Sequence, residues 1–409
     1  MRFFEVVVRN RVFCQTVCYF CLADIYQLEE LMLFKDIVGQ DELKDRLIRG
    51  IREGRISHAQ LFLGEPGSGT IPLAIAYAQY LNCSDRGEHD SCGVCPSCHK
   101  MQKLMHPDIH FTFPINKTSE IGDKVVVSDL FLGYWRSIVQ NLTYFDEQDW
   151  YSHIDLGNKQ GLISVAEADN IIKKLSFKAY EAEYKVLLMW LPERMNQSAS
   201  NALLKLVEEP PAKTIFLMIA QEEGKILKTI LSRTQIIRVP RIKYEDMVQS
   251  LGQKYPNSSM PVESVARLSS GSMIEARRLL ELDEEGDEFF GYVIGLLRFC
   301  YQSNVIGLVD WSEEVATLGR DRIKRLLAYA ERVIREAFML NLRMEAVSYL
   351  PLNPEQLKFY ANFKPFIRPN NIEETFMLLN TAIHHINANG NPKIVLSDMA
   401  LKMVKLIKP

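Results

Sequence analysis

The sequence lacks any long apolar run, and it lacks an excess of charge of one sign. No stretch approaches the roughly 20 uninterrupted apolar residues that a transmembrane helix requires, so we expect a soluble, cytoplasmic protein with no membrane contact. Its 48 Lys and Arg residues nearly balance its 51 Asp and Glu residues, and the formal net charge is −3. This balance excludes a global electrostatic attraction to nucleic acid, so any DNA contact must come from a local patch or from a partner.

The N-terminal segment also lacks the uninterrupted apolar core of a secretory signal, because Arg9 and Arg11 lie within it. Met32 stands just before the recognisable domain sequence, which begins at Phe34. We therefore expect translation to start at Met32, with residues 1–33 as an extension outside the domains. The cysteines of this extension have no fourth ligand nearby and would make a poor closed metal site; they are Cys14, Cys18 and Cys21.

A chain of 409 residues is long enough for two or three domains. From residue 59 onward, short β-rich runs alternate with helical patterns, which is typical of a parallel sheet covered by helices on both faces. The expected strands are Ala59–Leu63, Ile109–Phe113, Lys185–Trp190, Thr214–Ala220 and Gln235–Val239. Helices are expected over Pro72–Asn82 and Asn201–Val207.

A further helix is predicted after Ser164, which forms an S-x-x-E capping box with Glu167. Apolar residues then recur at helical spacing and predict one buried stripe: Val165, Ala168, Ile171, Ile172 and Leu175.

Beyond Pro240 the strand pattern fades and helical periodicity continues to the end, notably over Ile323–Leu342 and Glu374–Asn387. We therefore expect an α/β domain over residues 34–240, a small helical domain over 241–282 and a second helical domain over 286–409. Residues 116–159 form a long insertion with aromatic pairs, to which the sequence assigns no function.

The α/β domain contains a phosphate-binding loop without its lysine. Gly64, Gly67 and Gly69 follow the first expected strand and precede a helix, which is the place of a P-loop. A working loop needs Lys and then Ser or Thr after the last glycine, to reach the phosphates and hold magnesium. Thr70 and Ile71 occupy those positions. The alternative is a glycine-rich turn unrelated to P-loops.

The acidic pair that completes an ATPase site is also missing, because the strand Lys185–Met189 continues into Trp190. Glu193 remains, three residues beyond the position where the metal-binding acid is expected. We therefore predict no ATP hydrolysis, and we regard ATP or ADP binding at the loop as doubtful.

Four cysteines follow at a spacing of C-x8-C-x2-C-x2-C: Cys83, Cys92, Cys95 and Cys98. Four thiolates suit tetrahedral zinc and leave no open coordination position, so we predict a structural zinc module over residues 83–98. Disulfides are the alternative, although a cytosolic chain keeps its thiols reduced. His89 and His99 are close enough in sequence to serve as substitute ligands, whereas Cys300 is predicted to be a buried apolar residue.

Arg233 follows Ser232 in a loop that precedes the last expected strand. An arginine at the edge of such a domain can reach a neighbouring subunit and stabilise charge on a γ-phosphate, as arginine fingers do. Taken alone, the position equally suits a surface or structural arginine.

Several of these segments together resemble the clamp-loader branch of the AAA+ superfamily, in particular the delta-prime subunits of bacterial DNA polymerase III. The segments are Phe34–Gln40, His58–Phe62 with the degenerate loop, the four cysteines, the N-A-L-L-K-L-V-E-E-P-P run over Asn201–Pro211, and Ser232-Arg233. The run over Asn201–Pro211 is highly specific to this branch. The resemblance covers residues 34–409, with strong motifs up to 235.

The resemblance implies an AAA+ α/β domain with an inserted zinc module, a helical lid and an all-α collar that assembles a five-subunit ring. It implies gamma/tau motor subunits and a delta subunit as partners, with a sliding clamp and primed DNA contacted through the complex. It also implies a subunit of the DNA polymerase III holoenzyme that hydrolyses no ATP alone and lends Arg233, with Ser232, to a neighbour's ATP site.

The sequence departs from the family pattern at two positions and in one segment. Thr234 replaces the cysteine of the usual Ser-Arg-Cys triplet, and Ile274 replaces the arginine that senses the γ-phosphate in active relatives. The insertion is also longer than the family leads one to expect.

Three other functions are compatible with parts of the sequence. An active motor subunit would need the missing lysine and acid. A free zinc-module DNA-binding protein would need a strongly basic surface with interleaved aromatic residues, whereas the module has only Lys100 and Lys103 nearby and lacks that aromatic pattern. The third is a divergent AAA+ scaffold subunit in DNA repair or recombination, which the motifs exclude least. Association with a clamp-loader motor subunit separates this scaffold from the delta-prime-type function.

Overall fold

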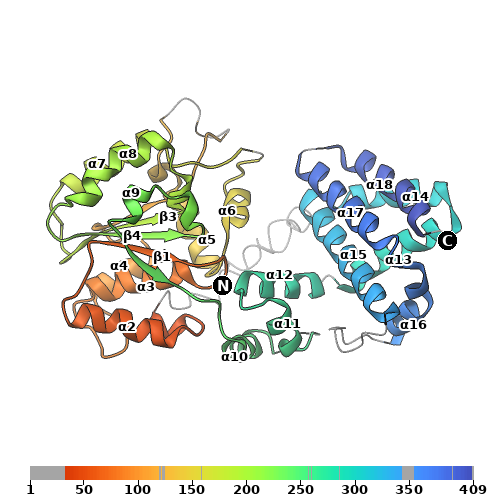
Figure 1. Cartoon of the computed structure of the whole chain (residues 1–409), viewed down its shortest axis with the longest axis horizontal. Helices are drawn as coiled ribbons and strands as arrows, with labels where there is room; N and C mark the ends of the chain where they lie inside the picture. The colour runs from red at the N-terminus through yellow and green to blue at the C-terminus, as the bar shows by residue number, and fades with distance from the viewer. Residues whose placement is uncertain are drawn as a thin grey trace, which may run out of the picture.

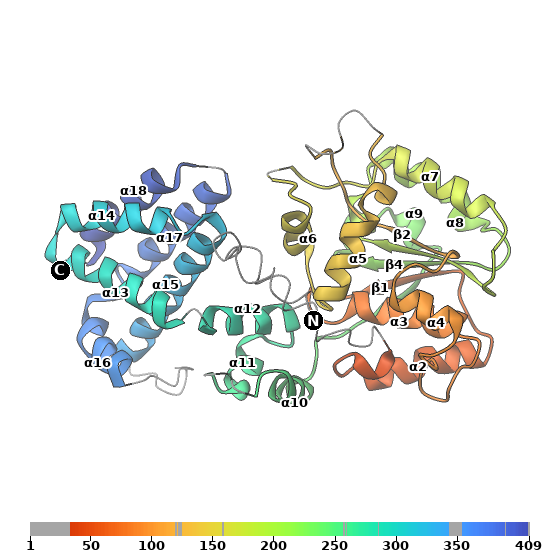
Figure 2. The same cartoon turned by 180° about the vertical axis from the view of Figure 1, so that it is seen from behind.

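The structure is a computed structural model that describes residues 33–118, 121, 125–157, 159–256, 258, 260–284, 286–342, 354–388 and 390–407. Almost all of the predicted N-terminal extension, with its three cysteines, lies outside these residues. Figures 1 and 2 show an α/β unit at one end of the molecule, a bundle of helices at the other, and three shorter helices between them.

The α/β unit contains a five-stranded sheet in which every strand pair is parallel. Its order is β2-β3-β4-β1-β5. The strands are β1 (Ala59–Leu63), β2 (Ile109–Thr112), β3 (Lys185–Trp190), β4 (Thr214–Ala220) and β5 (Gln235–Arg238). The predicted parallel sheet is confirmed, with β2 and β5 each one residue shorter at the C-terminal end than expected.

Both faces of the sheet are covered, which explains why the central strands are apolar without alternation. In β1, Phe62 packs into the core on one face and Leu61 into the core on the other. The first face is covered by α2 (Asp41–Arg52), α3 (Thr70–Asn82) and α4 (Pro96–Gln102). The second is covered by α7 (Val165–Ser176), α8 (Gln197–Glu208) and α9 (Lys228–Leu231).

The predicted start of α7 is only half right. Ser164 caps the helix, because its Oγ accepts a hydrogen bond from Glu167 N at 3.4 Å. The Glu167 carboxylate, however, accepts hydrogen bonds from Ser128 N at 2.7 Å and from the Thr112 hydroxyl at 3.0 Å. Glu167 is fully buried, and burial raises its pKa. It therefore fastens the long insertion to the end of β2 instead of closing the capping box.

The buried stripe of α7 is also narrower than predicted. Ala168, Ile171 and Leu175 are buried, whereas Val165 and Ile172 are exposed. The helix packs along α8 and the sheet on one side only, so an apolar residue just outside that side remains in contact with solvent.

The insertion is a folded part of the α/β unit. It contains η2 (Ser128–Phe131), α5 (Leu132–Asn141) and α6 (Glu147–His153). Trp135 and Trp150 are buried, and the Trp150 indole N–H donates to Pro114 O at 2.8 Å. One tryptophan of each aromatic pair noticed in the sequence thus belongs to the main core, whereas Tyr134 is exposed and Tyr151 is partly buried against that core.

Three helices connect the α/β unit to the bundle: α10 (Tyr244–Lys254), α11 (Val262–Leu268) and α12 (Met273–Glu284). They share a small apolar core of their own. We refer to them as the three-helix segment.

The C-terminal bundle consists of α13 (Gly286–Gln302), α14 (Val305–Ala316), α15 (Arg320–Asn341), α16 (Pro354–Phe363), α17 (Ile372–Asn387) and α18 (Pro392–Ile407). Cys300 is buried in it, as predicted, and lies 3.6 Å from Ala400 O. In the part of the chain that the structure describes, no helix has both the length and the apolar character needed to cross a membrane.

Candidate functional site

The degenerate P-loop keeps the backbone shape that its glycines predict. Gly67 and Gly69 have φ angles of +84° and +96°, in the left-handed region where a side chain is strained. A Cβ at Gly64 would lie 2.8 Å from Val239 O. The loop therefore needs glycine at these positions, and α3 begins at Thr70, directly after it.

The loop is covered by protein. Residues Gly67 to Thr70 are all buried, and Ile71 contributes to the main core. The start of α12 lies against the loop, where Met273 N donates to Gly67 O at 3.1 Å and the Ser272 hydroxyl donates to Pro66 O at 3.0 Å. Ile274, which stands where the family pattern places an arginine, is buried in the core of the three-helix segment.

The end of β3 is filled with aromatic side chains. Trp190 occupies the position of the missing acid and is buried. Its ring centroid lies 5.5 Å from that of Trp135 and 5.3 Å from that of Phe145, both from the insertion. This packing is apolar and provides no oxygen ligand for magnesium.

Glu193 bonds to the backbone that follows β4. Its Oε1 accepts hydrogen bonds from Gln221 N at 2.8 Å and Glu222 N at 3.3 Å. Burial raises the pKa of this carboxyl group. Glu193 therefore holds the turn after β4.

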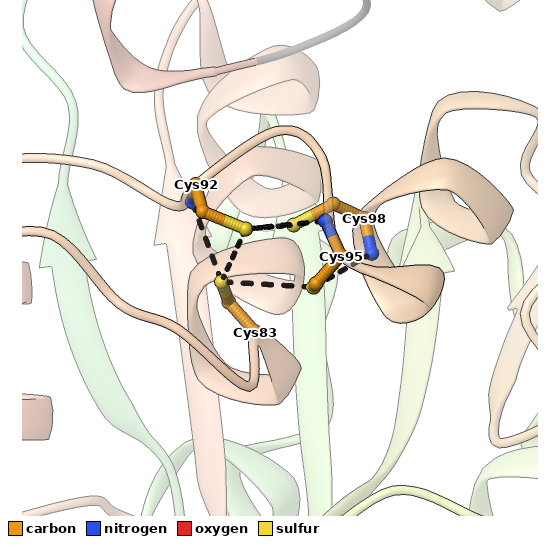
Figure 3. A group of neighbouring side chains, drawn as sticks. All are labelled: Cys83, Cys92, Cys95 and Cys98. Carbon is orange, nitrogen blue, oxygen red and sulfur yellow. Dashed lines mark hydrogen bonds between the residues drawn. The ribbon is translucent and has the colours of Figure 1, made fainter.

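The four predicted cysteines come together between the end of α3 and the start of α4 (Figure 3). All four Sγ atoms lie within 4.8 Å of one another. The Sγ–Sγ distances are 3.6 Å from Cys83 to Cys92, 4.0 Å from Cys83 to Cys95, and 3.9 Å from Cys92 to Cys98. A tetrahedral ion with metal–sulfur bonds of about 2.3 Å requires sulfur–sulfur distances of about 3.8 Å.

Local backbone geometry supports this arrangement. Cys98 N donates to Cys95 Sγ at 3.4 Å, and Cys92 N donates to Cys83 Sγ at 3.3 Å. Such N–H···S bonds stabilise thiolates, the form that binds metal. These cysteines are free thiols in the structure, so the disulfide alternative has no support. The four cysteines can therefore hold a metal ion.

Neither predicted substitute ligand belongs to this group. His89 and His99 are exposed, and the His99 ring Nδ1 lies 3.2 Å from Gln102 Oε1. Among the described residues, the group of potential metal ligands here consists of the four cysteines alone.

Arg233 lies at the sheet edge formed by β5, directly after α9. Ser232 and Arg233 are both exposed. The guanidinium Nη2 lies 2.5 Å from Glu208 Oε1, and Nη1 donates to Thr229 O at 2.8 Å and to Ser232 Oγ at 3.1 Å. In the isolated chain the side chain is therefore folded back onto α8, and the sequence did not indicate this pairing with Glu208.

The predicted site residues thus lie in three separate places: the P-loop, the cysteine cluster and the β5 edge. Sequence reasoning missed five residues of the insertion. Trp135 and Phe145 pack against Trp190, Tyr144 lies against the P-loop, and Asp146 and Asp149 pair with arginines of α12. The aromatic clustering of the insertion was the available signal, but its position against the P-loop follows only from the fold.

The fold and these sites define a parallel α/β protein with a glycine-rich loop that contains no lysine, and the helix after this loop leads into a four-cysteine cluster. The family model for the DNA polymerase III, delta subunit matches residues 39–243, half of the chain. The chain therefore belongs to this family. The match includes the P-loop, the cysteines and Arg233, and it ends before α10.

Individual relatives agree with this assignment. The chain is 30% identical over 235 residues to the DNA polymerase III subunit delta′ of Yersinia pestis, covering 56% of each chain. It is 26% identical over 241 residues to the subunit delta′ of Escherichia coli, covering 58% of this chain and 59% of that one. It is 25% identical over 262 residues to the subunit tau of Bacillus subtilis, covering 63% of this chain and 38% of that one. The chain thus spans a little over half the length of these delta′ relatives.

Proposed function

We propose that this chain is a delta-prime-type subunit of a replicative clamp loader of the AAA+ superfamily. It helps to load a sliding clamp onto primed DNA, hydrolyses no ATP itself, and donates Arg233 to the ATP site of a neighbouring subunit. The observation that carries the proposal is the altered P-loop within a DNA polymerase III family domain. Thr70 and Ile71 stand where Lys and a magnesium ligand are needed, and Trp190 stands where the acid is needed.

The position of Arg233 supports its role as a finger. It is exposed at a sheet edge, where a neighbouring subunit has access. Its partner Glu208 is itself 41% exposed, and exposed ion pairs contribute only about 0–1 kcal/mol. Release of the guanidinium toward a phosphate therefore costs little.

Zinc is the proposed occupant of the cysteine cluster. Four thiolates at tetrahedral distances suit zinc and leave no position for catalysis, so its role is structural. The loop between Cys83 and Cys92 is fastened to the rest of the α/β unit, because Asp90 accepts hydrogen bonds from Phe34 N at 3.1 Å and Lys35 N at 2.9 Å. Zinc thereby stabilises the whole first domain.

The helical parts fit the remaining roles. We assign residues 241–282 to a lid and residues 286–409 to a collar that assembles with other subunits. The start of α14 leaves Val305 and Ile306 exposed by 54% and 75%, and Leu401 on the neighbouring α18 is 42% exposed. Exposed apolar side chains of this kind suit contact with a partner helix.

Association with a motor subunit tests the proposal. The purified chain, mixed with a gamma/tau-type motor subunit and a delta-type subunit, is expected to co-elute with them as one complex in size-exclusion chromatography. Bovine serum albumin in place of the chain controls for non-specific retention. Absence of a complex at micromolar concentrations would favour the repair or recombination scaffold instead.

A further inference from the structure

Tyr144 lies where the P-loop, Val38 and the three-helix segment meet. Its hydroxyl oxygen accepts a hydrogen bond from Val38 N at 3.0 Å. Its ring is close enough to the loop that a Cβ at Gly69 would lie 3.5 Å from Tyr144 Cε1. Tyr144 is buried within the apolar core of α10–α12, and burial raises its pKa to about 12. An insertion residue is thus part of the three-helix segment's core.

Two arginines of α12 extend this contact. Arg277 Nη2 lies 2.7 Å from Asp149 Oδ2, and Arg277 Nη1 donates to Tyr144 O at 3.1 Å. Arg278 Nη2 lies 2.8 Å from Asp146 Oδ2 and 3.5 Å from Asp149 Oδ1. These four side chains are between 15% and 31% exposed, so solvent screens the ion pairs less than it screens pairs on the open surface.

The two carboxylates are positioned by their own helix. Asp146 Oδ1 accepts hydrogen bonds from Gln148 N and Asp149 N, both at 3.0 Å, and Asp149 Oδ2 accepts one from Asp146 N at 3.2 Å. This capping box begins α6. The insertion therefore presents two fixed carboxylates to α12. These carboxylates lose little further conformational freedom when the arginines pair with them.

The P-loop completes the contact. A Cβ at Gly67 would lie 2.1 Å from Ser272 Oγ, so α12 begins directly against the loop. In a nucleotide-binding P-loop protein, phosphates lie along the loop backbone and the start of the following helix. Here the loop instead contacts Met273 on one side and Tyr144 on the other.

We propose that residues 144–149 act as an internal substitute for nucleotide and hold the three-helix segment against the α/β unit in one orientation without a ligand. This inference rests on the proposed function, in which the P-loop of this chain is inactive. Tyr144, Asp146 and Asp149 are positioning residues, with Arg277 and Arg278 as their counterparts. The chain then enters a complex with its β5 edge and its three-helix segment in a preset relation, whatever the nucleotide concentration.

Hydrogen–deuterium exchange on the isolated full-length chain tests this. In the native chain, the amides of Val38 and Met273 are expected to be protected, and 1 mM of a non-hydrolysable ATP analogue should leave their exchange unchanged. In R277Q/R278Q these amides should exchange roughly 10-fold or more faster, because hydrogen bonds to charged groups are lost. The capping box of α6 remains intact in this variant. Tyr144→Phe should accelerate exchange at Val38 without affecting Met273.

Arg267→Gln, an exposed arginine on α11, is the matched control and should leave both amides as in the native chain. Unchanged protection of the β1 and β4 amides in R277Q/R278Q shows that the α/β unit remains folded. Native-like exchange at Met273 in that variant would overturn the proposal, as would protection by the ATP analogue in the native chain. The exchange measurement uses no partner subunits. Its result therefore tests the role of residues 144–149 independently of whether the chain forms a complex with motor subunits.

Discussion

Replacing Arg233 by alanine is expected to lower ATP turnover of the assembled complex by roughly 10³-fold at the site that it serves, since arginine fingers contribute 10³ to 10⁵ in rate. The side chain is exposed, and its polar partners among the described residues are Glu208, Thr229 and Ser232, so its removal should leave the fold intact. Single-turnover hydrolysis by the complex, measured at saturating subunit concentrations, reports the effect. Total steady-state turnover should fall less where other sites remain active.

Arg238→Ala is the matched control for this variant. Arg238 lies on β5, the edge strand that follows Arg233, is 71% exposed and pairs with Glu223 at 3.1 Å. It should leave the chemical step unchanged. If Arg233→Ala assembles normally and hydrolyses ATP at the native rate, Arg233 is a surface arginine and the finger assignment is wrong.

Replacing Cys95 and Cys98 by serine is expected to lower bound zinc from about one ion per chain to near zero. Structural zinc contributes roughly 10 to 16 kcal/mol in small zinc modules. Here the hydrogen bonds of Asp90 already order the loop between Cys83 and Cys92. We therefore expect the free energy of unfolding to fall by about 3 kcal/mol, which lowers the melting temperature by about 10 °C. Metal analysis of protein purified without chelator, together with calorimetry, measures both quantities.

Cys300→Ala controls for the loss of a thiol outside the cluster. Cys300 is buried in the C-terminal bundle, so this change should leave zinc content unchanged even where it lowers the stability of the bundle. A native chain that carries no zinc, with its thiols reduced, would contradict the metal assignment.

The sheet was predictable because it depends on local pattern and on burial. Runs such as Lys185–Trp190 and Thr214–Ala220 are β-rich throughout, and a strand covered on both faces needs no polar alternation. The four-cysteine cluster was predictable for a related reason. Its members are close in sequence, so one short segment, between the end of α3 and the start of α4, brings them together.

Contacts between distant segments were not predictable in this way. Glu167 matches a capping box in sequence, yet its carboxylate accepts hydrogen bonds from Ser128 N and the Thr112 hydroxyl. The Ser128 amide is buried and therefore needs a hydrogen-bond acceptor, which Glu167 provides. Asn196 also escaped notice: its Oδ1 accepts a hydrogen bond from Ala199 N at 2.8 Å, so α8 begins at Gln197, four residues before the predicted Asn201.

The contacts of the insertion at the candidate site were not predictable from local pattern either. Its aromatic residues predict a core, but their placement against β3 and the P-loop depends on a chain path that composition does not encode. The pairing of Arg278 with Asp146 spans 132 residues of sequence, and although Asp146 caps α6, no local pattern indicates Arg278 as its partner. Trp190 is the exception, because a tryptophan where a metal-binding acid is expected already predicted an incomplete ATPase site.

ATP turnover by the purified chain, first alone and then with motor subunits, clamp and primed DNA, tests the central claim most directly. The account predicts no turnover above buffer for the chain alone, and turnover by the mixture that exceeds that of the motor subunits without it. Robust hydrolysis by the lone chain, free of contaminating ATPase, would contradict the assignment of Thr70, Ile71 and Trp190 to an inactive site.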